Sequence, residues 1–366
     1  MLAVFDDDAT IAHALAFEGA LARAQAAEGV ISEELGLAIV DACITTTISS
    51  AELAEESALA GTLAIPLVAR LRAALSGDAR KAAHKGATSQ DVADTVLMIQ
   101  TRAAAELLLT DLDRIVDALS RLALHHADTP SVGRTLLQDA LPVAFGLRIA
   151  HWTVGVADAA QRLRRDVGDH ARIQLGGAAG TRAGLDGAGL AIASHVAKEL
   201  GLAASEPWHA RRIGIAAIGT SLAIAMGAIG KIARDIALLS QNTVGEAREP
   251  AVAGRGGSSA MAHKRNPTGC QIALSAALRA PGLAATLLVG LPQEEERGLG
   301  GWQAEGPVLA DLFLLAAGAA EAMAGVAEGL EIDEDAIARN LSNAGIETDI
   351  GESAAIVSAL ISKLQG

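Results

Sequence analysis

The sequence predicts an all-α protein, and three features lead to this fold class. Hydrophobic residues make up 51% of the 366 residues and charged residues only 20%, which supplies apolar side chains for a large core. Aromatic residues make up 2%, and there is no Tyr. The apolar residues are mostly Ala, Leu, Ile and Val. This pattern favours closely packed helices over a strand-rich sandwich.

The first part of the chain has the pattern of several short helices. Between residues 9 and 75 apolar residues recur at helical spacing, with interruptions near Gly29, Ser49 and Gly77. We therefore expect a small N-terminal helical domain over residues 1–99.

Longer helices are predicted after this domain. Residues 92–126 would run about nine helical turns without Gly or Pro, and residues 141–172 are nearly as long, with Pro142 in the first turn, where it is tolerated. Four further helical segments are residues 185–200, 213–244, 268–291 and 308–330. We expect these segments to form a central long-helix bundle over residues 100–330, followed by a tail of two short helices over residues 331–366.

Charge and cysteine content limit the partners and the compartment. The 29 Lys and Arg against 43 Asp and Glu give a net charge of −14, which argues against a nucleic-acid partner. Cys43 and Cys270 lie far apart and no secretory leader is recognisable, so we expect a reduced, cytoplasmic protein. The uncharged segment 213–230 is rich in Ala and Gly, which favours a buried helix, and we expect no membrane partner. The nine His show no metal-ligand spacing, and we expect neither a metal nor a cofactor.

The most unusual stretch is residues 253–267, AGRGGSSAMAHKRNP, which we call the 253–267 loop. Its glycines permit backbone conformations that other residues avoid. The hydroxyls of Ser258 and Ser259 stand beside cationic residues, which can hold an anion or lower the pKa of a serine. The composition therefore predicts a loop that carries chemistry.

Three motifs resemble those of the fumarase/aspartase superfamily. Residues 257–267 resemble its signature GSSxMPxKxNP, with Ala262 in place of the usual Pro. Residues 84–91, HKGATSQD, resemble its HxGxTSxD segment, and residues 133–138, GRTLLQ, resemble its GRTHLQ segment. The motifs occur in the order that the superfamily has.

The resemblance implies a fumarase/aspartase-like homotetramer with a truncated C-terminal domain and active sites shared between chains. It implies that Ser258 is the base that removes a proton next to a carboxylate and produces an aci-carboxylate intermediate. It implies that Lys264 and Asn266 bind the carboxylate and stabilise its charge. It also places a set of residues at substrate-binding positions: His84, Thr88, Ser89, Arg134, Thr135, Gln138, Arg212, Ser259, Met261 and His263.

Leu136 is the most informative departure from the superfamily pattern. Most members carry at this position a His that helps to protonate a departing amine or hydroxide, and an apolar side chain cannot donate a proton. A carboxylate leaves as a stable anion and needs no proton donor. The residue therefore predicts that a carboxylate adds or leaves within one molecule, which closes or opens a lactone. This reaction is typical of the cycloisomerase branch of the superfamily, which acts on a tricarboxylic diene.

A tricarboxylate substrate requires local cations in a protein of net charge −14. The candidates in or near the motif segments are Arg134, Arg212, Arg255, His263, Lys264, Arg265 and Arg297. Glu246 precedes the 253–267 loop at a position where the superfamily also carries a Glu, and we expect it to orient the loop or a neighbouring base.

Two other functions remain open. One is a fumarate-releasing lyase acting on adenylosuccinate or argininosuccinate, which Leu136 argues against. The other is a non-catalytic structural protein on the same scaffold, which the intact Ser258, Lys264 and Asn266 argue against.

Overall fold

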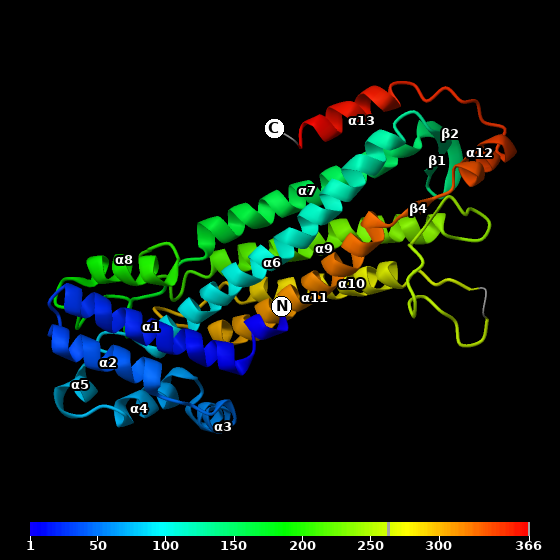
Figure 1. Cartoon of the computed structure of the whole chain (residues 1–366). Coiled ribbons are helices and arrows are strands. Elements are labelled where there is room, and N and C mark those ends of the chain that lie inside the picture. Colours follow the sequence, from blue (N-terminus) through cyan, green and yellow to red (C-terminus); the bar gives the residue numbers. More distant parts are fainter. Residues whose placement is uncertain (262–263, 365–366) are drawn as a thin grey trace. The chain divides into compact units, whose positions relative to one another are not determined.

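The computed structural model describes residues 1–261 and 264–364, and it confirms the all-α fold class. Helices carry most of the described residues, and the described strands form two antiparallel pairs (Figure 1). The chain divides into two compact units. Unit 1 comprises residues 1–105, 166–218 and 286–310, and unit 2 comprises residues 106–165, 219–285 and 311–366. The sequential division at residues 99 and 330 stays a prediction.

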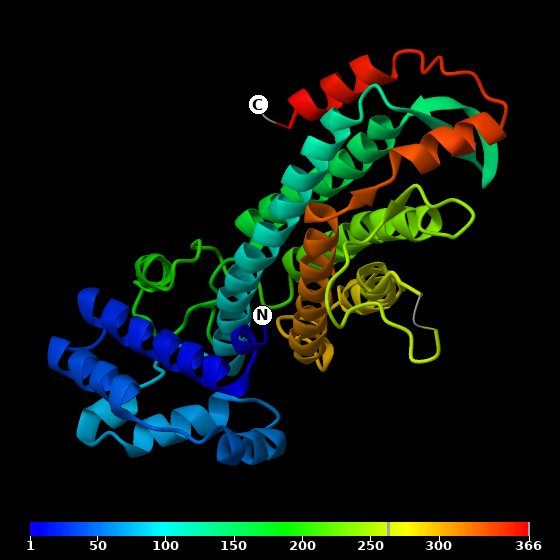
Figure 2. The same cartoon turned by 45° about the vertical axis from the view of Figure 1, so that its right-hand side comes forward.

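Unit 1 opens with short helices, as the sequence predicts. The Asp6, Ser32 and Ser49 side chains each accept a hydrogen bond from a backbone N–H of the following helix, which explains where three of these helices begin. The elements are η1 (Leu2–Val4), α1 (Asp7–Ala27), α2 (Glu33–Thr45), α3 (Ser50–Ala60), α4 (Ala64–Ala73) and α5 (Gly77–Ala82). Helices α1 and α2 lie side by side in both views (Figures 1 and 2). A buried cluster joins them to α4 and includes Ala22, Ile39, Ala42 and Leu71.

The longest helices follow, and they agree with the predicted segments apart from their ends. They are α6 (Ser89–His125), α7 (Phe145–His170), α9 (Ile213–Leu239), α10 (Thr268–Val289) and α11 (Gly301–Glu328), with the shorter α8 (Gly189–Leu200). In unit 2 one face of α6 is buried through Leu108, Leu112, Ile115 and Leu119, which recur at helical spacing.

The predicted helical start at residue 141 is wrong. Pro142 lies in a hairpin of two strands, β1 (Pro130–Thr135) and β2 (Gln138–Ala144), and α7 begins only at Phe145. Pro142 pairs with Val132 in this two-stranded ribbon, where a proline is tolerated because every strand is an edge. The pairing is irregular at Gly133, where a Cβ would lie 2.4 Å from the Leu141 carbonyl oxygen, so this close approach requires glycine.

The end of the described chain belongs to unit 2. Strand β3 (Ala247–Arg248) pairs with β4 (Glu331–Ile332), and the helices α12 (Glu334–Asn343) and α13 (Ser353–Ser362) follow. These are the two short helices predicted from the sequence. Figure 2 shows α12 beside the β1–β2 hairpin.

Three helices are long and apolar enough to cross a membrane by length and composition alone, and a bent pair, α2 with α3, would add a fourth segment. In the most apolar window of each, the buried share of residues is 56% for α9, 28% for α10 and 44% for α11. Much apolar helical surface is therefore left uncovered within the described part of a single chain.

Candidate active site

The structure divides the predicted site residues between the two units. Unit 1 holds His84, Thr88, Ser89 and Arg212. Unit 2 holds the predicted residues of the hairpin and of the 253–267 loop, which are Arg134, Thr135, Gln138, Ser258, Ser259, Met261, Lys264 and Asn266. His263 and its neighbour Ala262 lie outside the described residues.

Ser258 sits in a turn that supplies it with hydrogen-bond donors. Its Oγ accepts from the backbone N–H of Ala260 at 3.3 Å and from that of Met261 at 3.1 Å. A serine can act as a base only if negative charge on its oxygen is stabilised, and backbone donors aimed at an oxyanion do this. The geometry of Ser258 therefore suits a proton-accepting role.

Asn266 hydrogen-bonds to two glycines of the 253–267 loop. Its Nδ2 donates to the Gly257 carbonyl at 3.2 Å, and its backbone N–H donates to the Gly256 carbonyl at 2.7 Å. Gly256 has φ +73°, and a Cβ there would lie 2.6 Å from the Asn266 carbonyl oxygen. The side chains of Ser259, Met261 and Lys264 are exposed in the same loop.

The ends of the loop are held by acidic groups. Arg265 donates to both carboxylate oxygens of Glu331 at 3.1 Å. Glu249 accepts from the backbone N–H of Gly269 at 3.0 Å and of Cys270 at 2.7 Å, at the start of α10. Burial, reinforced by Glu249, raises the pKa of the Cys270 thiol, so this cysteine stays protonated and is an inert core residue.

The Arg134 guanidinium forms an ion pair with the Glu246 carboxylate. Its two terminal nitrogens contact the two oxygens of Glu246 at 2.9 and 2.6 Å. The Glu246 side chain is fully buried, and Asn340 of α12 also donates to it at 2.8 Å. Glu246 thereby ties the hairpin and α12 to the chain just before the 253–267 loop, and its predicted role in orienting that loop stays a prediction.

The hairpin tip consists of Leu136 and Leu137. Both have left-handed backbone conformations, with φ of 51° and 65°. Their exposed fractions are 97% and 77%, and the flanking Thr135 and Gln138 are exposed as well. An exposed, strained apolar pair is unfavourable for folding, which points to a functional reason for its presence.

Asp91 is an organising residue of unit 1 that the predicted site set did not include. Its buried carboxylate accepts four hydrogen bonds, from the backbone N–H groups of Thr88, Gly176 and Gly177 at 2.9 to 3.0 Å and from His209 Nε2 at 2.8 Å. It thereby joins the 84–91 segment to two distant segments. The sequence signal that could have indicated this role is that Asp91 is the Asp of the HxGxTSxD motif.

His84 is the first residue of the 84–91 segment, and its side chain pairs with a buried carboxylate. Its Nδ1 is 2.6 Å from an oxygen of Glu18, whose side chain is fully buried. Burial lowers the pKa of His84, but the charge and hydrogen bond of Glu18 outweigh it, so the pKa is raised above its ordinary value.

Arg212 forms a buried cluster with two carboxylates. Its guanidinium contacts both oxygens of Asp94 at 2.7 and 2.8 Å and Glu305 at 2.9 Å, and its side chain is fully buried. Burial raises the pKa of Glu305, and repulsion from the Asp94 carboxylate adds to this, although the Arg212 cation opposes both. This arrangement favours a positioning role for Arg212 over direct contact with a substrate.

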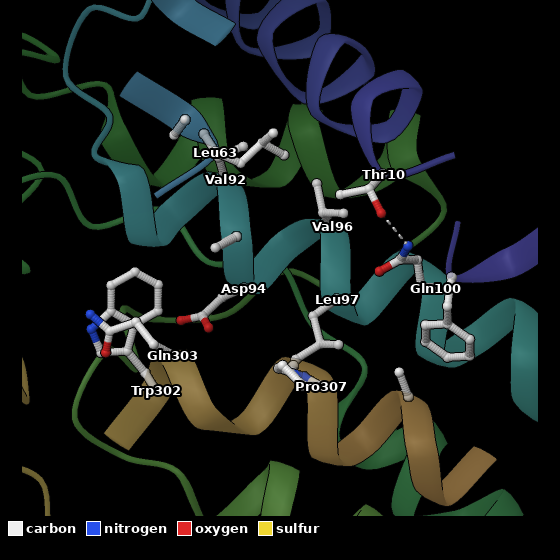
Figure 3. A pocket seen from close by; sticks show the side chains of 15 residues that line it. Thr10, Leu63, Val92, Asp94, Val96, Leu97, Gln100, Trp302, Gln303 and Pro307 are labelled. Carbon is white, nitrogen blue, oxygen red and sulfur yellow. Dashed lines mark hydrogen bonds between the residues drawn. The ribbon is translucent and has the colours of Figure 1, made fainter. Parts of the chain in front are cut away.

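A pocket of about 360 Å³ in unit 1 does not suit an anionic substrate. Figure 3 shows apolar side chains such as Val96, Leu97 and Pro307 around it, and Gln100 hydrogen-bonded to Thr10. Its charged lining residue among those described is Asp94, a carboxylate that would repel a tricarboxylate. We therefore do not assign the substrate to this pocket, and the motif residues remain the candidate active site.

Comparison with known proteins decides the family. A family model described as lyase matches residues 3–282. The chain belongs to this lyase family. It is 46% identical over 345 residues to a protein of Bradyrhizobium diazoefficiens named 3-carboxy-cis,cis-muconate cycloisomerase, which covers 93% of this chain and 76% of that protein. It is 45% identical to a protein of the same name from Pseudomonas aeruginosa, over 93% of this chain and 75% of that protein.

A solved structure supports the same assignment to the lyase family. The crystal structure of 3-carboxy-cis,cis-muconate lactonizing enzyme from Pseudomonas putida matches with a TM-score of 0.92 at 34% identity, covering 99% of this chain and 96% of that one. These findings confirm the resemblance drawn from the three motifs and the expected fold. They also make this chain an enzyme of the lyase family.

Proposed function

We propose that this lyase-family enzyme interconverts 3-carboxy-cis,cis-muconate and 4-carboxymuconolactone, the cycloisomerase step of protocatechuate catabolism in the β-ketoadipate pathway. The observation that carries the proposal is the pair of backbone N–H donors on Ser258 Oγ. The names of the relatives in Bradyrhizobium and Pseudomonas support the same reaction.

In the lactonising direction, a carboxylate of the substrate adds to a double bond of the same molecule. A carboxylate oxygen of the substrate forms a bond to a carbon of the diene, and the electrons of that double bond move onto the neighbouring carboxylate to give an aci-carboxylate. Lys264 and Asn266 stabilise this charge, and the Ser258 hydroxyl delivers a proton to carbon and regains one from water. In the reverse direction Ser258 removes that proton and the carboxylate leaves.

Leu136 fits this reaction because no proton donor is needed for the departing carboxylate. Thr135 and Gln138 flank it on the exposed hairpin tip, and we assign both a substrate-binding role. In unit 1 the 84–91 segment supplies His84, Thr88 and Ser89 for the other carboxylates of the substrate. Arg134 and Arg212 support the site through their buried ion pairs.

The assembly we propose is a homotetramer with active sites shared between chains. The uncovered apolar surface of α9, α10 and α11 supports this, because packing against other copies would bury it. On this view the helices are intersubunit elements of a cytoplasmic protein and no membrane or nucleic acid is a partner. The reaction needs no cofactor.

The decisive experiment is an ultraviolet assay that follows loss of the conjugated diene of 3-carboxy-cis,cis-muconate. We expect turnover with the purified enzyme, and a loss of about 10²- to 10⁴-fold in Ser258→Ala. Ser358→Ala, at a surface serine of α13, is the matched control and should keep full activity. Fumarate release from adenylosuccinate without diene turnover would favour the fumarate-releasing alternative. A folded protein that turns over neither substrate would favour the non-catalytic alternative.

A further inference from the structure

Two histidines and a glutamate converge in unit 2, where the proposed reaction does not use them. His125 and His126 are at the end of α6, and Glu334 is the first residue of α12. One donor atom from each lies within 4.8 Å of the others. Residues of these three types in such a cluster are potential metal ligands.

The surrounding chain fixes one of the three ligands. His126 is 4% exposed, and its ring meets the Phe145 ring edge to face at 5.9 Å. Its carbonyl accepts from the Gly146 N–H at 2.8 Å. A Cβ at Gly146 would lie 2.2 Å from the Ala123 carbonyl oxygen, so α6 and α7 meet here without room to move.

The fixed ring holds Nδ1 3.2 Å from the Thr129 hydroxyl, a contact that a bound metal ion would replace, and at a separation from Glu334 that suits a metal ion. His126 Nδ1 is 3.5 Å from Glu334 Oε1, and two ligands bound tetrahedrally at about 2.1 Å from zinc lie about 3.4 Å apart. The exposed His125 ring stands at 87° to His126, with 4.7 Å between centroids. His125 and Glu334 are both exposed, so small side-chain rotations bring all three donors to bonding distance.

The electrostatics of the cluster also favour a cation. The carbonyls at the C-terminal end of α6 carry partial negative charge. The Glu334 carboxylate supplies a further negative charge, with its Oε1 3.5 Å from His126 Nδ1.

We propose that His125, His126 and Glu334 form a binding site for a divalent transition-metal ion, with zinc the best-matched ion and water as the fourth ligand. The ion would join the end of α6 to the start of α12, and it has no part in the proposed reaction. The proposal is therefore independent of the enzyme's activity.

The test is titration of the full-length, chelator-treated protein with Co²⁺, whose visible absorption reports tetrahedral nitrogen and oxygen ligands, followed by displacement with Zn²⁺. We expect one ion per chain and full displacement by zinc. His125→Asn and Glu334→Gln change exposed side chains and should each weaken binding by at least about 10-fold. Asp335→Asn, at the neighbouring acid of α12, and His151→Asn, at an exposed histidine of α7, are matched controls and should leave binding unchanged.

Absence of a saturable cobalt spectrum would overturn the proposal. So would binding that persists equally in His125→Asn and Glu334→Gln, because the ion would then lie elsewhere. Both results can be read without measuring turnover, so failure here leaves the proposed cycloisomerase function untouched.

Discussion

Arg134 and Glu246 form a bidentate ion pair that joins the β1–β2 hairpin to the chain just before the 253–267 loop. Glu246 is fully buried, and a second arginine, Arg148, has a terminal nitrogen 3.9 Å from its carboxylate. One buried carboxylate therefore ties the hairpin motif to the chain that leads into the 253–267 loop.

Removing that carboxylate should be costly. Glu246→Ala removes the buried carboxylate that Arg134 and Arg148 share and leaves Arg134 only the exposed Asp139, 3.6 Å away. We expect a loss of about 3–5 kcal/mol in the free energy of unfolding, measured by urea denaturation. Glu331→Ala breaks the exposed pair with Arg265 and should cost less than about 1 kcal/mol. Equal losses in the two variants would contradict the structural importance of the Arg134–Glu246 pair.

Two glycines of the 253–267 loop allow a matched test of loop geometry. Gly254 and Gly256 both have positive φ, so an alanine at either position pays a similar backbone penalty. Only at Gly256 would the new Cβ clash with another residue, the Asn266 carbonyl at 2.6 Å. We expect Gly256→Ala to lower kcat about 10²-fold through displacement of Asn266. Gly254→Ala should stay within about 3-fold of the parent enzyme in the diene assay, since its Cβ meets nothing within 4 Å.

The hairpin tip should show a conflict between stability and activity. Replacing Leu136-Leu137 by Asn-Gly supplies the residues that a two-residue turn with positive φ prefers. We expect the free energy of unfolding to rise by about 2 kcal/mol, because the backbone strain is relieved and little apolar burial is lost. Thermal unfolding and diene turnover should move in opposite directions. A variant that is more stable and equally active would show that the leucines do not serve the reaction.

The His84–Glu18 pair predicts a pH-dependent contribution to stability. Because the pKa of His84 is raised in the folded state, the pair stabilises fully below the ordinary imidazole pKa of about 6.5, and this contribution is lost as pH rises through the folded-state pKa. The stability difference between the parent and Glu18→Gln should therefore be largest near about pH 6 and shrink by about pH 9. Urea midpoints across this range provide the measurement, and a difference that is constant with pH would refute the assignment.

Much of the fold follows from local sequence signals. Ser and Asp residues mark the starts of α1, α2 and α3, and the absence of Gly and Pro over residues 92–126 predicts α6. The hairpin was missed because its turn is Leu136-Leu137 rather than Asn-Gly, so nothing local indicates it. Helix ends were placed too late where polar residues such as Gln241 follow Leu239.

The motif residues of the candidate site could be found from sequence, but their partners could not. Arg212 is predicted from its motif position, whereas Asp94 and Glu305 lie 118 and 93 positions away and carry no mark of the pairing. Similarly, the bond between Asp91 and His209 depends on the packing of distant segments. Long-range ion pairs among buried groups emerge only when the chain is folded.

The Leu136-Leu137 turn also bears on how this protein would change under selection. A library selected only for resistance to heat or protease should discard both leucines early, because their side chains are mostly exposed in the described part of the chain and their backbone is strained. A library selected for growth on an aromatic acid should keep them. The hairpin tip is thus the place where the two kinds of selection are expected to yield different sequences from the same starting gene.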